Sequence, residues 1–149
     1  MHEIIIQENT FEKARKIINK NKDKKIIFSS DNDELNRKVL EKLEINIILL
    51  NQKNRKDFQK QRNSGCNQVL AKLAKKKGIA IGINFDELKN SKSLKEKSEI
   101  IARVRQNIIL CNKNKLKMKF ISKEKKPFIH DLKALGLSLG MPTWMTKEL

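Results

Sequence analysis

The chain has 149 residues, a length that suits one domain, so we expect a single domain over residues 1–149. Its 34 lysine and arginine residues outnumber 17 acidic ones, and the net charge of +17 favours a polyanionic partner, either nucleic acid or an anionic membrane surface. A hydrophobic fraction of 38%, with two prolines and five glycines, excludes a disordered low-complexity chain.

From the N-terminus onward, short apolar runs alternate with segments of helical period. Strands are predicted over residues 3–7, 25–30, 45–51, 79–85 and 118–122. Helices are predicted over residues 11–20, 31–43, 67–77, 94–114 and 128–136. Asp31 or Asp33 is the expected N-cap of the second helix, and Gly78 and Gly136 are the expected ends of the third and fifth. The segment after residue 136 gives no clear pattern.

Each strand is followed by a crossover of a dozen residues or more, which is too long for a hairpin and requires parallel strands in right-handed βα units. The strands are continuous apolar runs, as expected when both faces of a sheet are covered. The sequence therefore predicts an α/β fold. It is either an open doubly wound sheet or a TIM-barrel-like sheet truncated at about five strands, because a full eight-unit barrel takes about 250 residues.

The longest apolar run, residues 45–50, is too short to span a bilayer, and the N-terminus lacks the basic and apolar regions of a secretion signal. Cys66 and Cys111 form no CxxC pair. We therefore expect a cytoplasmic protein with no membrane partner, whose two thiols are reduced and buried.

Residue types that bind metals or carry out catalysis are sparse. His2 and His130 lie at opposite ends of the chain, and the sequence has no HExxH, nucleophile-elbow or phosphate-loop motif. Asp31, Asp33 and Glu34 follow a strand, where barrel enzymes hold catalytic carboxylates, but they also fit ordinary helix capping. We predict no catalytic residue, no metal ligand and no cofactor bound by the protein itself.

The basic loop, defined as residues 52–64, is the most informative segment. Its five cations are interleaved with amide side chains, which suits contacts with the phosphates and sugars of structured RNA; the alternative is a merely solvated loop. The predicted RNA contacts in the whole chain are Lys38, Arg55, Lys56, Arg62, Lys72, Lys77, Arg103 and Arg105. We expect changing Arg55 and Arg62 to Ala to weaken RNA binding and to leave folding intact.

Three segments carry a resemblance to a known family. They are "RNSGCNQVLAKLAKKKGIAIGINF" (residues 62–85), "ARVRQNIILCNKNKLKMKFIS" (residues 102–122) and "DLKALGLSLGM" (residues 131–141). In this order and at similar separations they resemble the signatures of archaeal ribonuclease P protein component 3, the thirty-kilodalton subunit family. The resemblance covers most of the chain from Lys25 onward.

The resemblance implies a subunit of the ribonucleoprotein that removes the 5′ leader of precursor tRNA. In that family the RNA subunit carries the active site and its Mg²⁺ ions, while the protein pairs with component 2 and stabilises the catalytic RNA. The expected partners are therefore ribonuclease P RNA, component 2 with other protein subunits, and precursor tRNA. The isolated chain would then be no enzyme, although the holoenzyme is an endoribonuclease.

This sequence departs from the family pattern in three ways. Gln68 stands where the family often has His, the basic loop is a few residues longer, and "EIIIQ" (residues 3–7) matches a third strand of the family's barrel and not a first. Three alternatives remain: a general RNA-binding α/β protein such as a ribosome-associated one, a metal-dependent phosphoesterase, and a membrane-surface protein.

Overall fold

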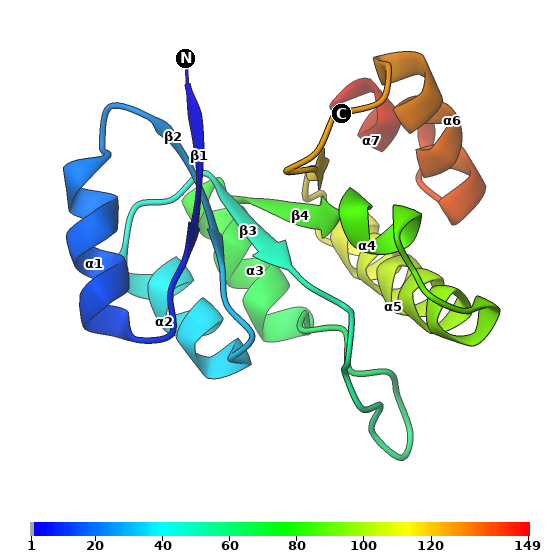
Figure 1. The fold of residues 1–149 in the computed structure, drawn as a ribbon, viewed down its shortest axis with the longest axis horizontal. Helices are drawn as coiled ribbons and strands as arrows, with labels where there is room; N and C mark the ends of the chain where they lie inside the picture. The colour runs from blue at the N-terminus through cyan, green and yellow to red at the C-terminus, as the bar shows by residue number, and fades with distance from the viewer. Residues whose placement is uncertain (1) are drawn as a thin grey trace.

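The computed structural model describes residues 2–149, and in that range five parallel strands form one sheet in the order β1-β2-β3-β4-β5 (Figure 1). The strands are β1 (Glu3–Gln7), β2 (Lys25–Ser29), β3 (Ile47–Leu50), β4 (Ala80–Asn84) and β5 (Met118–Ile121). The helices are α1 (Phe11–Lys20), α2 (Asp33–Lys42), α3 (Gln68–Lys77), α4 (Phe85–Lys89), α5 (Leu94–Lys113), α6 (Ile129–Leu139) and α7 (Thr143–Lys147). The predicted α/β fold of parallel βα units is confirmed.

The two faces of the sheet are covered differently. Because side chains alternate along a strand, one face of every strand packs against the helices and the other lines the inside of the curved sheet. The helix-covered face is the main core, to which the strands contribute Ile6, Ile26, Phe28, Ile48, Leu50, Ile81, Ile83, Met118 and Phe120. The inner face has a smaller cluster of Ile27, Ile47, Leu49 and Ile121, with Ile5 and Ala80 packed against it.

The sheet remains open between its first and last strands. In residues 2–149, β1 pairs only with β2 and β5 only with β4. A groove of about 500 Å³ lies between the two edges, lined in part by Ile5, Ile27 and Ile121. The Lys123 ammonium donates to Gln7 Oε1 at 2.7 Å and bridges the gap near the carboxyl ends of the strands. The fold is thus TIM-barrel-like but not closed.

We expect these open edges to make the purified chain self-associate, because unpaired backbone groups and apolar side chains at a strand edge attract another strand. Ile5→Lys places a charge beside the groove, so it should reduce the association seen by light scattering. Leu137→Lys, at an exposed site on α6, is the matched control. Association of the Ile5 variant equal to that of the control would show that the edges are not the cause.

Two predicted helix ends were wrong for local reasons. The N-cap of α2 is Asn32 and neither aspartate, since Asn32 Oδ1 accepts from the amides of Glu34 and Leu35. Helix α6 does not end at Gly136 but continues to Leu139, and Gly140 caps it with a φ of 105°. Gly136 is there for close packing, because a Cβ at this position would lie 2.8 Å from Met141 Sδ.

One further helix end was predicted correctly, and two short helices were not predicted. Gly78 ends α3 as predicted, with a φ of 69°. The sequence missed α4, because Phe85 follows the apolar run of β4 and was read as its last residue; instead Asn84 caps a new helix. It also missed α7, which lies in the segment after residue 136.

Cys66 and Cys111 are buried and form no disulfide, as expected. Within residues 2–149, no helix combines the length and apolar character needed to cross a membrane.

Candidate nucleic-acid interface

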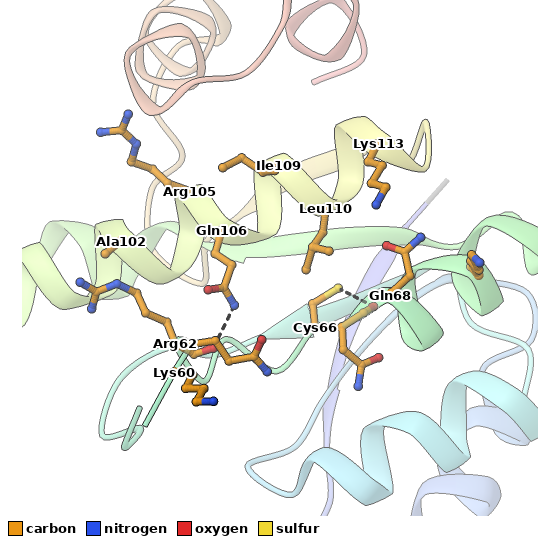
Figure 2. A pocket seen from close by; sticks show the side chains of 13 residues that line it. Lys60, Arg62, Cys66, Gln68, Ala102, Arg105, Gln106, Ile109, Leu110 and Lys113 are labelled. Carbon is orange, nitrogen blue, oxygen red and sulfur yellow. Dashed lines mark hydrogen bonds between the residues drawn. The ribbon is translucent and has the colours of Figure 1, made fainter. Parts of the chain in front are cut away.

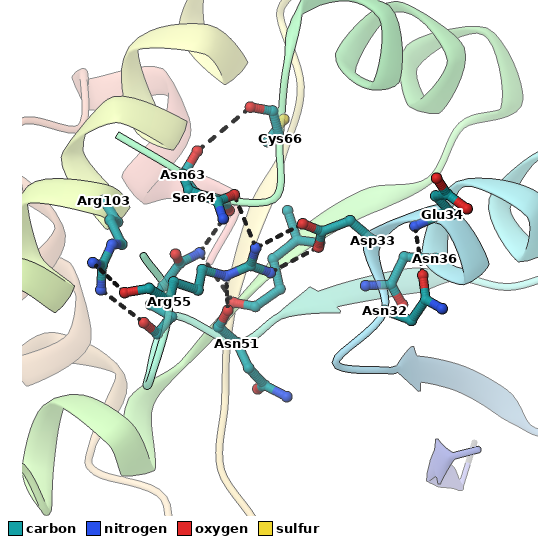
Figure 3. A network of polar contacts seen from close by, with 12 residues as sticks. Asn32, Asp33, Glu34, Asn36, Asn51, Arg55, Asn63, Ser64, Cys66 and Arg103 are labelled. Atoms are coloured by element: carbon teal, nitrogen blue, oxygen red, sulfur yellow. Dashed lines mark hydrogen bonds and ion pairs between the residues drawn. The ribbon is translucent and has the colours of Figure 1, made fainter. Parts of the chain in front are cut away.

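The basic loop leaves the carboxyl end of β3 and is anchored by Arg55 (Figure 3). The Arg55 guanidinium donates to both carboxylate oxygens of Asp33, at 2.8 and 2.9 Å, and its Nε donates to the Asn51 carbonyl. This bidentate pair ties the loop to the first turn of α2. Gly65 is required beside it, because its φ is +78° and a Cβ there would lie 2.6 Å from Arg55 Nη2.

Arg103 anchors the same loop from α5. Its Nε donates to Asp57 Oδ1 at 2.9 Å, and its two terminal nitrogens donate to the carbonyls of Gln52 and Arg55 at 3.0 and 2.8 Å. Only 3% of Arg103 is exposed, so these hydrogen bonds take the place of the hydration that its guanidinium would have in water. The hydrogen bond from Arg103 is the main reason that the pKa of Asp57 lies below its usual value.

Buried and half-buried polar groups complete the anchoring. Glu87 of α4 accepts the backbone amides of Gln52 and Lys53 at 2.7 and 3.0 Å, although burial, the largest effect, raises the pKa of its carboxyl. The Gln52 amide group donates to the Ser64 carbonyl at 2.8 Å, and Asn107 of α5 donates to the same oxygen at 3.2 Å. The basic loop is therefore held by α2, α4 and α5, and is not a free solvated connector.

The anchored loop forms one wall of the basic cleft, which we define by the residues of the loop, α3 and α5 that line it (Figure 2). The cleft has a volume of about 1060 Å³. Its lining residues are Lys60, Gln61, Arg62, Cys66, Asn67, Gln68, Lys72, Ala102, Arg105, Gln106, Ile109, Leu110 and Lys113. Five of them are cations, and in the described part of the chain no carboxylate lines the cleft.

The charge and shape of this cleft suit a polyanion. Gln106, Leu110 and Lys113 point from α5 toward the loop and α3, while Arg105 and Ile109 lie on the neighbouring face of α5 (Figure 2). Helix α3 starts at the cleft with no acidic side chain in its first turn, so its positive dipole end adds to the field of the cations. Phosphate groups fit such an arrangement.

The predicted RNA contacts fall into two groups. Arg62, Lys72 and Arg105 line the basic cleft, and Lys56 is exposed beside a smaller pocket at Asp31 and Asp33. Arg62 also pairs with Asp57 Oδ2 at 3.2 Å, and the other four predicted contacts are engaged within the protein.

Internal contacts occupy Lys38, Arg55, Lys77 and Arg103. Lys38 lies over the Phe11 ring at 4.5 Å, and Lys77 donates to three carbonyls near the end of α2. Arg55 and Arg103 are bound to acidic partners as described above. Phosphate contacts by Arg55 and Arg103 would therefore require these internal ion pairs to open. The sequence alone predicts that changing Arg55 to Ala leaves folding intact, whereas this geometry leads us to expect a loosened basic loop.

Sequence reasoning did not single out Gln106 or Lys113. They lie seven residues apart on α5 and hence on one face, but only the packing of α5 against the loop and α3 shows that this face is part of the cleft. Lys60 belongs to the basic loop but was not among the predicted contacts.

The two thiols and the possible metal-binding side chains form no reactive cluster among residues 2–149. Burial raises the pKa of the Cys66 thiol to about 12 and raises that of Cys111 further. Among residues 2–149, no group of three or more His, Cys, Asp or Glu side chains is placed to hold a metal ion.

No protein-family profile and no curated protein sequence matches this chain. Among solved structures, it is similar to a chain in the cryo-EM structure of archaeal ribonuclease P with mature tRNA. The two chains superpose with a TM-score of 0.80 and are 25% identical in sequence. The match covers 97% of this chain and 62% of the other, so this chain spans less than two thirds of its neighbour's length.

Proposed function

We propose that this chain is a protein subunit of ribonuclease P, equivalent to component 3 of the archaeal enzyme. The structural likeness to a chain of archaeal ribonuclease P carries the proposal, since it extends over nearly the whole chain. The basic cleft supports it independently, because a cleft lined by five cations suits RNA. Residues 1–149 then act as one shortened barrel-like domain.

In this role the protein binds RNA and does not cleave it. The cations of the basic cleft neutralise phosphates of the ribonuclease P RNA, and the anchored loop keeps them in place before RNA arrives. Mg²⁺ and the chemistry of leader removal stay with the RNA subunit. Component 2 is the proposed protein partner, and its binding would stabilise the folded chain by mass action.

Reconstitution tests this proposal. We expect the purified chain alone to leave precursor tRNA intact, and the chain added to ribonuclease P RNA and component 2 to give cleavage at lower Mg²⁺ than the RNA alone requires. The measurement is the yield of mature 5′ ends across a Mg²⁺ titration. Metal-dependent cleavage by rigorously RNA-free protein would contradict the proposal.

A second candidate function is general binding of structured RNA, for example by a protein associated with the ribosome. The basic cleft fits that function equally well, because contacts to phosphates carry no sequence information. Sequencing the RNA that co-purifies with the tagged chain separates the two: ribonuclease P RNA supports the first, and ribosomal RNA the second.

A further inference from the structure

The basic cleft contains apolar side chains that phosphate binding does not need. Ile109 is 70% exposed, although its neighbour Ile108 is 1% exposed and belongs to the core. Leu110 points into the cleft, and Cys66 lies opposite, on the segment that leads into α3 (Figure 2). The cleft is therefore an apolar surface surrounded by cations, which differs from a uniformly charged phosphate track.

Hydrogen-bonding groups remain available around this apolar surface. The Gln106 amide group donates to the Arg62 carbonyl and to Ser64 Oγ, and its own carbonyl oxygen has no donor among residues 2–149. Asn67 Oδ1 accepts from the Leu70 amide as the α3 cap, which leaves the Asn67 NH₂ group to donate elsewhere. An acceptor and a donor thus lie on different walls, and the edge of a nucleobase presents both kinds of partner.

The volume of the basic cleft and the positions of its cations also suit a nucleotide. A volume of about 1060 Å³ is at the upper end of the clefts that bind small molecules, so it can hold one nucleotide with its flanking phosphates. Lys60 and Lys113 stand on opposite walls, and the basic character of the cleft disfavours a cationic ligand such as a basic peptide. Bases outside a helix are commonly held between apolar side chains with polar contacts at their edges.

We propose that the basic cleft accepts an unpaired nucleotide of bound RNA. Its base lies against Ile109 and Leu110, Gln106 and Asn67 meet the base edge, and the cations hold the phosphates on either side. This inference rests on the proposed function only for the choice of RNA as the ligand. The chain would then recognise bulged or looped RNA and not only the backbone of a duplex.

A fluorescent base analogue tests the proposal. The probes are two RNA hairpins of equal length, one with a single bulged 2-aminopurine and one with the same base paired in the stem. Stacking on neighbouring bases quenches 2-aminopurine, whereas the cleft is lined by aliphatic and polar side chains. We expect emission of the bulged probe to rise on binding, and the bulged hairpin to bind about fivefold more tightly than the paired one.

Two variants make the test specific. Ile109→Gln should bind both hairpins equally and lose the rise in emission. Val69→Gln, at a residue that is 54% exposed on α3 and outside the cleft lining, should behave as the wild type. Circular dichroism melting checks that both variants fold.

The possible failures are distinguishable. If the wild type binds both hairpins with equal affinity and without a change in emission, the inference is overturned while the proposed function stands. If the bulged hairpin is preferred but reconstitution of ribonuclease P fails, the cleft binds a nucleotide and the proposed function is wrong. If neither hairpin binds, both are overturned.

Discussion

Replacing Arg103 by Ala should lower the free energy of unfolding by about 3 kcal/mol, because it removes a buried side chain and leaves the loop carbonyls that it bonds without donors. The guanidinium is almost fully buried and serves three oxygens: the Asp57 carboxylate and the carbonyls of Gln52 and Arg55. Urea unfolding of the variant measures the effect.

Arg105→Ala is the matched control, since it removes the same side chain two residues along α5 from an exposed site. Its expected cost is below about 0.5 kcal/mol. Arg103→Ala should also raise amide hydrogen exchange across the basic loop, and Arg105→Ala should not. Equal stability of the two variants would show that the Arg103 contacts do not hold the loop.

Changing Lys60, Lys72 and Lys113 together to Gln should produce the largest loss of RNA binding. These lysines come from the loop, α3 and α5, and none of them takes part in an ion pair within residues 2–149. Each phosphate contact contributes about one to the slope of log affinity against log salt, so the slope should fall by about two to three. Near 0.1 M salt this corresponds to an affinity loss of about 100-fold.

The control triple variant is Lys13, Lys16 and Lys20 to Gln, at exposed sites on α1 that do not line the cleft. It removes the same net charge, so it measures the contribution of the overall field. Filter binding across a salt series compares the two variants. If both lower the slope equally, RNA is attracted by net charge and the basic cleft is not the interface.

The sequence predicted the fold well because the signals for it are local. Each strand is a continuous apolar run, such as "IILL" in β3, and each long helix has an apolar face, so the alternation of βα units follows directly. Helix ends were less predictable where one residue has two possible roles. Gly136 was expected to end a helix, but it provides close packing against Met141.

The candidate site was harder to predict because its contacts are distant in sequence. Arg103 and Asp57 lie 46 residues apart, and Arg55 and Asp33 lie 22 apart. A polar loop without apolar periodicity looks solvated in the sequence. Arg55 and Arg103 were therefore predicted to contact RNA, although each is engaged in contacts within the protein. Only the packing of α2 and α5 on the loop separates the anchoring arginines from the cations that remain exposed.

The strand order has a consequence for synthesis on the ribosome. Each strand pairs only with its neighbours along the chain, so the sheet can grow one unit at a time as the polypeptide emerges. The basic loop is the exception, since it follows β3 but its anchors Glu87 and Arg103 belong to α4 and α5. A nascent chain therefore carries a strongly cationic loop, held only by the Arg55–Asp33 pair to α2, beside ribosomal RNA until α5 has left the exit tunnel.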